Sequence, residues 1–334
     1  ADYPAISDLD GDGDLDILIT GEDIGNNYIS KIYRNNGNNT FTEQTGISLT
    51  GVYQGTATWA DYDNDGFKDL LITGFTSQSA AGTVSKLYRN IGDNSFAEQT
   101  GISLVKIYNG AVDWGDYNND GYPDILMTGS TPSGPVSTVY RNNGNSTFTE
   151  LTGIQLTALY SSTASWGDCN NDGYLDILIS GNSAASVRST KIYLNNGNET
   201  FTEYTGSQIT GIWVGSVAFG DYDNDSDLDI LISGQSGTSQ NISKVYRNET
   251  VAQNIRPAAP SGLGNSVIDG NVTLSWNRAT DNLTPQNGLT YNLYVYESGQ
   301  AVFRMSPHAF RQCHDLNGRR LISETGRIRC SSGG

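Results

Sequence analysis

Short runs of apolar residues recur along the first three quarters of the chain, and each run stops at a Thr-Gly or Ser-Gly pair. Residues 70–72, 125–127 and 177–179 are examples, and none of them alternates with polar residues. Because continuous apolar runs are typical of strands covered on both faces, we predict a buried strand at each of them. A segment of small residues that ends in an aromatic one, such as residues 56–59, lies upstream and predicts a second strand.

Strictly alternating segments follow the apolar runs after polar linkers of varied length. Alternation of this kind predicts an outer strand that is half exposed. The segments are residues 31–34, 86–89, 138–141, 191–194 and 244–247. An Asn-Asn-Gly-Asn turn, such as residues 35–38, then returns the chain into a fourth strand, residues 40–43 in the first case.

These units predict an all-β fold, a β-propeller of four-stranded blades with five repeat units visible. A four-stranded β-solenoid or a row of separate sandwiches is the alternative, but a loop between the two innermost strands of every unit suits a propeller better. Only four of the outermost strands are visible, so we expect either further blades outside this sequence or an unusually small ring.

A nine-residue acidic loop precedes each apolar run. The loops are residues 8–16, 61–69, 116–124, 168–176 and 221–229, and their starts are 53, 55, 52 and 53 residues apart. A fixed period of this size indicates a repeat architecture. Positions 1, 3, 5 and 9 carry carboxylates or amides, and position 7 can offer its main-chain carbonyl. Calcium accepts six to eight oxygen ligands in irregular geometry, whereas magnesium prefers an octahedron with retained waters, so we predict Ca²⁺, up to five ions with one per loop.

The predicted metal ligands occupy equivalent positions in the five loops. They are Asp8, Asp10, Asp12, Asp14 and Asp16; Asp61, Asp63, Asp65, Phe67 and Asp69; Asp116, Asn118, Asp120, Tyr122 and Asp124; Asp168, Asn170, Asp172, Tyr174 and Asp176; and Asp221, Asp223, Asp225, Asp227 and Asp229. Acidic turns without metal are the alternative, but five dense carboxylate loops would repel themselves without a cation. The amides Asn118 and Asn170 predict weaker binding in the third and fourth loops. Ser226 replaces the glycine of the other loops and predicts a strained turn.

The recurring Asp-x-Asp/Asn-x-Asp-Gly-x-x-Asp, followed by Ile-Leu-Ile-Thr-Gly and preceded by Trp-Gly-Asp or Phe-Gly-Asp, resembles the FG-GAP/VCBS repeats of the integrin α-subunit head and of many secreted bacterial proteins. The resemblance covers about residues 1–250. It implies an integrin-like, calcium-stapled propeller that works in adhesion or ligand binding.

The last quarter of the chain has a different pattern. Residues 251–260 contain Pro-Ala-Ala-Pro and predict a stiff linker. Residues 261–334 are expected to form a small β-sandwich-like module, because residues 272–276 and 289–295 alternate as strands. This part resembles the first half of a fibronectin type III module, but residues 303–329 depart from it, with six arginines and no clear alternating strand.

The net charge is −17, and it is unevenly distributed. Residues 1–255 hold 31 acidic and 11 basic side chains, a balance of −20, so nucleic acid is an improbable partner. No segment has the apolar length of a membrane span, and the three cysteines make no disulfide framework. Calcium at extracellular levels would load such loops, so we expect an extracellular or cell-surface protein whose targeting signal lies outside this sequence.

Four aromatic residues lie eight positions before a loop, and we predict that they ring the face opposite the calcium loops. They are Tyr53, Tyr108, Tyr160 and Trp213. Aromatic rings among Asn, Ser, Thr and Gly side chains suit a glycan or a protein loop. The alternative is that they only fill the gaps between blades.

These observations favour an extracellular calcium-stabilised binding or adhesion module for a glycan or an extracellular protein. The alternatives are a non-catalytic accessory region of a secreted carbohydrate-active enzyme, such as a polysaccharide lyase, and a structural spacer. We expect no enzyme activity, because the two histidines lie in the tail and the dense carboxylates are explained as metal ligands. The sequence does not indicate an oligomeric state.

Overall fold

The computed structural model describes residues 4–249 apart from residues 78, 93, 94, 238 and 239, and then residues 259–268, 271–277, 279, 280, 313, 314 and 327–330. The described residues are all-β with a single short 3₁₀ turn, η1 (Ala80–Gly82). No helix among them has the length and apolar character needed to cross a membrane.

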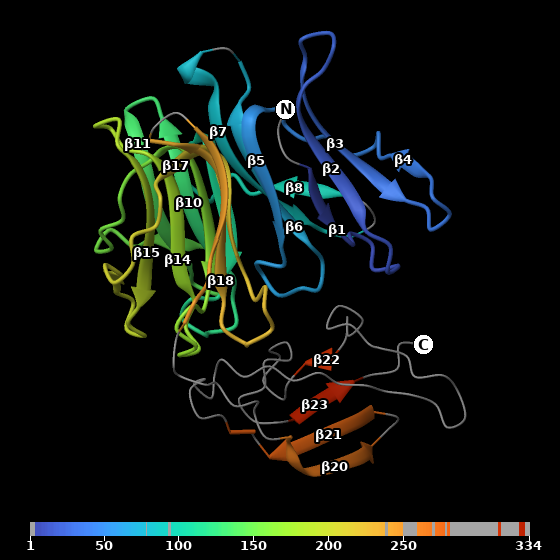
Figure 1. Ribbon diagram of the computed structural model, residues 1–334. Helices are drawn as coiled ribbons and strands as arrows, with labels where there is room; N and C mark the ends of the chain where they lie inside the picture. Colours follow the sequence, from blue (N-terminus) through green and yellow to red (C-terminus); the bar gives the residue numbers. More distant parts are fainter. Residues whose placement is uncertain are drawn as a thin grey trace.

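The predicted repeat units are antiparallel sheets that follow one another along the chain (Figure 1). Unit 1 consists of β1 (Ala5–Ser7), β2 (Asp16–Glu22), β3 (Tyr28–Asn35) and β4 (Phe41–Glu43). Unit 2 consists of β5 (Tyr53–Ala60), β6 (Asp69–Phe75), β7 (Thr83–Asn90) and β8 (Phe96–Glu98). Unit 3 consists of β9 (Tyr108–Gly115), β10 (Asp124–Thr131), β11 (Gly134–Asn142) and β12 (Phe148–Glu150). Unit 4 consists of β13 (Tyr160–Gly167), β14 (Asp176–Asn182), β15 (Arg188–Asn195) and β16 (Phe201–Glu203). Unit 5 consists of β17 (Ile212–Gly220), β18 (Asp229–Ser236) and β19 (Asn241–Tyr246).

Within each unit the strands pair in chain order, as the sequence pattern predicts. In unit 3, for example, β10 pairs with β9 on one side and with β11 on the other, and β12 lies at the outer edge. The apolar runs are the second strands, and in units 2 to 4 they are completely buried. The sheet of unit 5 has three strands among the described residues.

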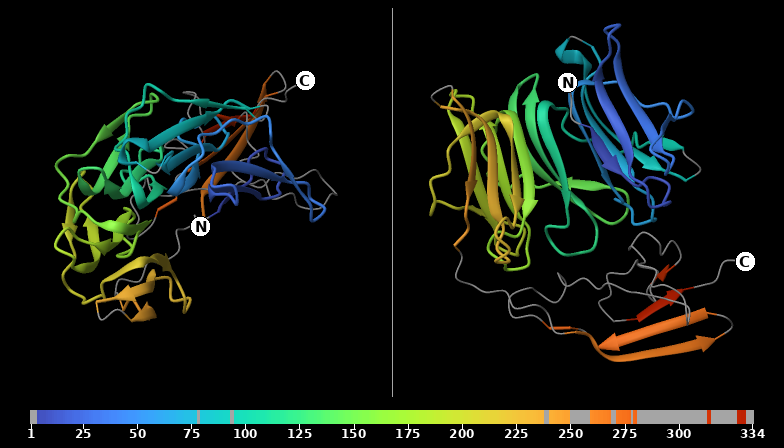
Figure 2. Two further views of the ribbon diagram at one scale, coloured as in Figure 1. Left: turned by 90° about the horizontal axis from the view of Figure 1, so that it is seen from above. Right: turned by 45° about the vertical axis from the view of Figure 1, so that its right-hand side comes forward.

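The hydrophobic core lies between consecutive units. Leu71 and Leu87 of unit 2 pack against Ile125 and Met127 of unit 3, and the same arrangement recurs at the other joints. The first strands of neighbouring units also lie side by side, from β1 against β5 to β13 against β17. The units are therefore arranged as propeller blades, and the described residues form an open arc (Figure 2).

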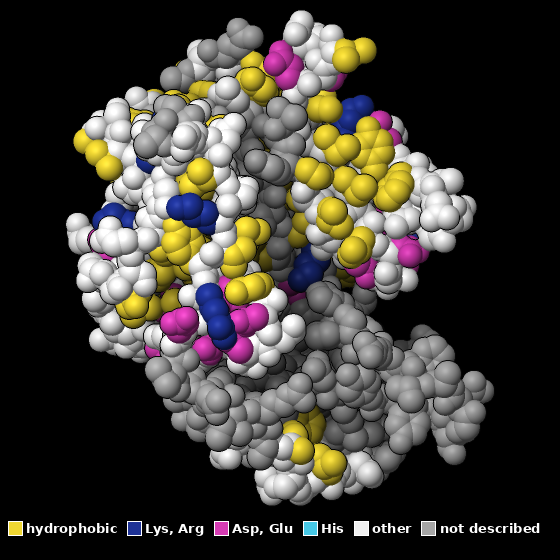
Figure 3. Space-filling view, in the orientation of Figure 1, with side chains coloured by type: hydrophobic (Ala, Val, Ile, Leu, Met, Phe, Trp, Pro, Cys, Tyr) yellow, Lys and Arg dark blue, Asp and Glu magenta, His cyan; other side chains and the backbone are white. Residues whose placement is uncertain are grey.

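The two end units expose apolar side chains that the inner units bury. Ile19 of unit 1 is 41% exposed and Leu231 of unit 5 is 49% exposed, whereas the equivalent Ile72 and Leu126 are fully buried. Hydrophobic side chains are visible on the outer face of unit 1 (Figure 3). Each end of the arc therefore exposes an apolar sheet face whose equivalent is buried against the next unit elsewhere in the arc.

The C-terminal part forms a separate four-stranded sheet. Its strands are β20 (Ser261–Ile268), β21 (Asn271–Asn277), β22 (Cys313–His314) and β23 (Arg327–Cys330), in the order β20-β21-β23-β22. The strand predicted at residues 272–276 is confirmed by β21, and the one predicted at residues 289–295 lies outside the described residues. Residues 303–329 show no clear alternating strand in the sequence, but the structure has β22 within this tail and β23 at its end, and β23 pairs with β21 and β22. Segments of two and four residues are too short to show an alternation.

Candidate metal centres

All five acidic loops lie at the same end of the arc. Each loop joins the first strand of a unit to the second, and its last Asp pairs with the final residue of the first strand, as Gly115 pairs with Asp124. The equivalent pairing occurs in every other unit. Acidic side chains gather beside basic ones at the end of the units nearest the C-terminal sheet (Figure 3). The fold therefore places the predicted metal ligands on one face.

The aspartate at position 9 of each loop is the most deeply buried of the predicted ligands. In unit 2, Asp69 is fully buried, and its two carboxylate oxygens accept hydrogen bonds from the backbone N–H groups of Tyr62, at 3.0 Å, and Asn90, at 2.8 Å. Burial raises the pKa of Asp69 and of its equivalent Asp124 to about 8. The position-9 carboxylate thus fixes the start of the loop to the end of the third strand, at the cost of losing its hydration.

The remaining acidic side chains turn inward because they accept hydrogen bonds from the loop backbone. In unit 3, Asp116 accepts from the N–H groups of Asp120 and Gly121, and Asp120 accepts from Tyr122. Such side-chain-to-backbone bonds stabilise a tight coil in place of regular structure. Position 6 has a positive φ, which glycine adopts without strain, but Ser226 holds the same place with φ at +74°. The strained turn predicted for Ser226 is therefore confirmed, and its backbone is left-handed.

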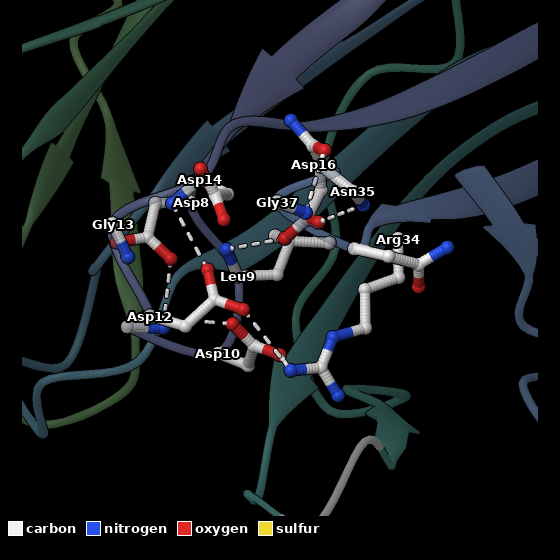
Figure 4. A network of polar contacts seen from close by, with 12 residues as sticks. Asp8, Leu9, Asp10, Asp12, Gly13, Asp14, Asp16, Arg34, Asn35 and Gly37 are labelled. Atoms are coloured by element: carbon white, nitrogen blue, oxygen red, sulfur yellow. Dashed lines mark hydrogen bonds and ion pairs between the residues drawn. The ribbon is translucent and has the colours of Figure 1, made fainter. Parts of the chain in front are cut away.

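Three loops bring carboxylates close enough to share one ion. The groups are Asp8, Asp10 and Asp16; Asp61, Asp63 and Asp69; and Asp221, Asp223 and Asp225, and within each group one oxygen of every residue lies within 4.8 Å of the others. Figure 4 shows this arrangement in loop 1. Position 7, occupied by Asp14, Phe67, Tyr122, Tyr174 or Asp227, contributes no side chain to these groups, and the role predicted for its main-chain carbonyl stays a prediction.

The donor set fits a calcium ion. All the atoms that converge in these three groups are carboxylate oxygens, which calcium accepts in irregular geometry. In loop 5 the Oδ1 atom of Asp223 is buried and has no hydrogen-bond partner, which a bound cation would supply. In loops 3 and 4, the side-chain oxygens of Asn118 and Asn170 accept a hydrogen bond from the backbone N–H of position 5, which is Asp120 or Asp172. Their side-chain Nδ2 atoms donate to the carboxylate of the same aspartate.

An arginine at or directly after the end of the third strand pairs with the carboxylates at positions 3 and 5 of three loops, a contact that the sequence analysis did not predict. Arg89 pairs with the Oδ2 atoms of Asp63, at 2.5 Å, and Asp65, at 2.8 Å. Arg34 (Figure 4) and Arg247 make the equivalent pairs in units 1 and 5. The sequence signal is the Tyr-Arg-Asn at or directly after the end of these strands, but unit 3 carries the same three residues, so the motif alone does not predict the contact.

Units 3 and 4 lack this contact. The guanidinium of Arg141 pairs with Glu199 of the next unit, and unit 4 has Leu194 at the same place. These are also the units with an amide at position 3. The arginine is therefore found beside the loops that have a carboxylate, and not an amide, at position 3. Its positive charge offsets part of the extra negative charge from which weaker calcium binding was predicted for loops 3 and 4.

The four predicted aromatic residues lie at the opposite end of the units, and Tyr53, Tyr108 and Trp213 contact the preceding unit. The ring of Tyr53 stacks on Tyr28 of unit 1, with centroids 5.4 Å apart. Tyr108 packs against Phe75 of unit 2, with centroids 4.1 Å apart. Arg188 of unit 4 lies over the ring of Trp213 at 5.4 Å. For these rings, the alternative that they fill gaps between blades is therefore supported, although Tyr53, Tyr108, Tyr160 and Trp213 all remain partly accessible.

The residue after each of these aromatics has a strained backbone. Gln54, Asn109, Ser161 and Val214 have φ angles between +44° and +50°, and the strand register shifts at this point in each first strand. A β-branched residue such as Val214 is rarely found there, and Val214 is also 65% exposed. Strain of this type is concentrated at functional sites, so it marks the aromatic end of the arc as a candidate binding surface.

The sequence model of the family described as FG-GAP-like repeat matches four segments, residues 8–72, 75–127, 129–179 and 168–232. Together these segments span more than half of the chain. No curated protein matches the sequence.

Solved structures with a similar arrangement are remote in sequence. An Agrocybe aegerita lectin, described in a study of its specific recognition of non-reducing terminal N-acetylglucosamine, has a TM-score of 0.38 and 19% identity, covering 74% of this chain and 80% of that one. An endo-arabinase from Bacteroides thetaiotaomicron VPI-5482 has a TM-score of 0.39 and 11% identity, covering 73% and 92%. A thermostable family-43 glycoside hydrolase has a TM-score of 0.38 and 11% identity, covering 74% and 90%.

Proposed function

The chain belongs to the FG-GAP-like repeat family, and from this premise we propose that it is an extracellular, calcium-stabilised binding or adhesion module of the integrin-like type. The carrying observation is the convergence of carboxylate oxygens in the loops, within 4.8 Å of one another in three of them. The unpartnered, buried Oδ1 atom of Asp223 supports a cation at the same place. When bound, the ion would supply positive charge that holds the loop carboxylates together, and its role would be structural.

Calcium binding can be measured directly by equilibrium dialysis followed by elemental analysis. We expect up to five Ca²⁺ per chain. The variant Asp120→Ala removes one inward carboxylate of loop 3 and should lower the stoichiometry by one, whereas Glu150→Ala, on the outer strand β12, should leave it unchanged. A chain that retains no calcium would contradict the proposal.

We further propose that the ligand is a glycan or a loop of an extracellular protein and that it binds at the aromatic end of the arc, without catalysis. The partly accessible rings and the strained residues beside them support this surface. A cavity of about 230 Å³ also adjoins it, lined among others by Arg188, Lys191, Glu203 and Tyr204. An exposed ring among charged and amide side chains provides stacking and hydrogen bonds together, as sugar recognition requires.

Glycan-array binding of variants tests this surface. Tyr204 is 42% exposed, so Tyr204→Ala should weaken binding with little effect on stability, and adding Tyr108→Ala and Trp213→Ala should abolish it. The matched control is Tyr222→Ala, because Tyr222 is 57% exposed but lies in a metal loop at the other end. Unchanged binding by the folded triple variant would place the ligand site elsewhere.

For the remainder of the chain, we propose that residues 1–250 form the repeat domain, residues 251–260 a linker and residues 261–334 a fibronectin type III-like module. The change from repeat sheets to the separate sheet β20-β21-β23-β22 supports this division. Limited proteolysis should cut first within residues 251–260, and a first cut inside a repeat unit would contradict the division.

A further inference from the structure

Asparagines at or just beyond the ends of the third strands connect the metal loops of units 3, 4 and 5 with the loop of the preceding unit. The backbone N–H of Asn142 in unit 3 donates to Asp124 Oδ1 of its own loop at 2.7 Å. Its side-chain Nδ2 donates to the carbonyl of Tyr62, at position 2 of loop 2, also at 2.7 Å. Asn195 and Asn248 make the equivalent pairs of bonds in units 4 and 5. Each of these asparagines therefore contacts two consecutive loops.

These bonds complete a path between the buried carboxylates of neighbouring loops. The N–H of Tyr62 donates to Asp69 Oδ2 at 3.0 Å, so only Tyr62 and Asn142 separate Asp69 from Asp124. The path continues through equivalent bonds. In order it passes through Asp69, Tyr62, Asn142, Asp124, Tyr117, Asn195, Asp176, Cys169, Asn248 and Asp229. The position-9 carboxylates of loops 2 to 5 are thus joined in one hydrogen-bonded series.

A second asparagine, at position 4 of the loops, reinforces each connection from the opposite direction. Asn64 Nδ2 donates to the Gly121 carbonyl of the next loop at 2.8 Å, and Asn119 donates to Gly173 at 2.9 Å. Asn171 donates to the Asp227 carboxylate at 2.6 Å. All three have φ near +60°, a conformation that asparagine tolerates better than most residues. Each pair of consecutive loops from loop 2 to loop 5 is therefore joined by two asparagine side chains, one from each unit.

The series is interrupted between units 1 and 2. Position 4 of loop 1 is Gly11, which has no side chain to donate, and position 2 is Leu9 where loops 2 and 3 have a buried tyrosine. Asn90, the equivalent of Asn142, donates its Nδ2 to the Lys68 carbonyl of its own unit at 3.2 Å. A cavity of about 230 Å³, lined by Leu9, Asn90 and Phe96 among others, lies at this joint.

From this geometry we propose that calcium ions in loops 2 to 5 bind cooperatively as one array and that loop 1 binds independently. The inference rests on the proposed calcium function. An ion that orders one loop fixes its position-9 carboxylate and its position-2 backbone, which are the groups that the neighbouring loop contacts. The next loop then loses less conformational freedom when it binds, and this coupling is reciprocal. The connecting bonds of Asn142 and Asn195 are buried and that of Asn248 is partly buried, so water competes little for them.

Calorimetric titration of the metal-free full chain with Ca²⁺ tests the array. Asn195→Ala removes one of the two connections between loops 3 and 4, its Nδ2 bond to the Tyr117 carbonyl, together with bonds to the Leu175 carbonyl and from the Gly197 N–H. Asn90→Ala is the matched control, because it removes the equivalent bonds within unit 2 and no connection between loops. We expect Asn195→Ala to reduce the cooperativity and to weaken the coupled sites about fivefold or more, whereas Asn90→Ala should retain the cooperativity.

A gain of coupling is the complementary test. Gly11→Asn introduces at loop 1 the donor that the other joints possess, at a residue whose φ of +76° asparagine can adopt. We expect the independent site to join the array in this variant. If Asn195→Ala does not fold, Asn119→Ala, which removes only the second connection of the same joint, replaces it.

The outcomes separate the two proposals. A titration that detects no calcium binding would overturn both the calcium function and the array. Five independent sites in the unaltered chain, or cooperativity that Asn195→Ala and Asn119→Ala leave intact, would overturn the array alone.

Discussion

At the scale of single residues, charge around the loops is adjusted from outside the loop itself. Arg89 offsets the additional carboxylate of loop 2 and pairs with Asp63 and Asp65, whereas Arg141 of unit 3 pairs with Glu199. A guanidinium beside a cation site repels the cation but stabilises the empty loop. The arginine thus lowers the calcium affinity of the loop and raises the stability of the metal-free protein.

This exchange predicts opposite effects of one substitution. Arg89→Gln should strengthen calcium binding at one site by about 1 kcal/mol, roughly fivefold in affinity, and lower the melting temperature of the metal-free protein. Arg141→Gln is the matched control and should leave calcium affinity unchanged. Calorimetric titration and thermal melting of both variants measure the two effects, and weaker calcium binding by Arg89→Gln would show that the arginine orders the ligands instead.

At the scale of the loop, the buried carboxylates make stability depend on pH. Asp69 and Asp124 have a pKa of about 8 in the folded chain, because burial penalises the charged form. An unfolded aspartate titrates near 3.9, so between about pH 4 and pH 8 the folded state binds protons that the unfolded state does not. This contribution is complete below pH ~4 and is lost as the pH rises through ~8.

The metal-free protein should therefore melt at a lower temperature at pH 8 than at pH 5. Calcium requires the deprotonated carboxylates, so the increase in melting temperature that it produces should be larger at pH 8. Melting curves of dialysed protein at both pH values, with and without calcium, measure the difference. An equal calcium effect at both pH values would mean that these carboxylates are already ionised in the metal-free fold.

The strands and the loops were predictable from sequence because they depend on local patterns. The apolar run before each Thr-Gly or Ser-Gly pair marks β6, β10 and β14, and the acidic spacing marks the loops. The bonds between loops were not predictable, since Asn142 and Tyr62 are 80 residues apart and only the blade-to-blade packing brings them together. The aromatic residues were placed correctly at the opposite end, but their stacking on neighbouring units depends on the same packing.

At the scale of the whole molecule, stability depends on the joints between units. Leu126 is fully buried between units 3 and 4, whereas the equivalent Leu231 of unit 5 is 49% exposed. Leu126→Ala should lower the free energy of unfolding by about 3–5 kcal/mol, and Leu231→Ala by about 0.5 kcal/mol or less. Chemical denaturation of both variants provides the comparison, and equal losses would indicate that another surface covers unit 5 in solution.

Thermal unfolding of the metal-free chain, compared with the chain in excess Ca²⁺ or excess Mg²⁺, tests the calcium proposal most directly. Each filled site should stabilise the folded state by about 2.7 kcal/mol at a hundredfold excess of free ion over Kd, so calcium should raise the melting temperature by many degrees. Magnesium should have little effect, because the irregular oxygen cages do not offer the octahedral geometry that it requires. Identical melting curves in calcium, magnesium and chelator would contradict the account.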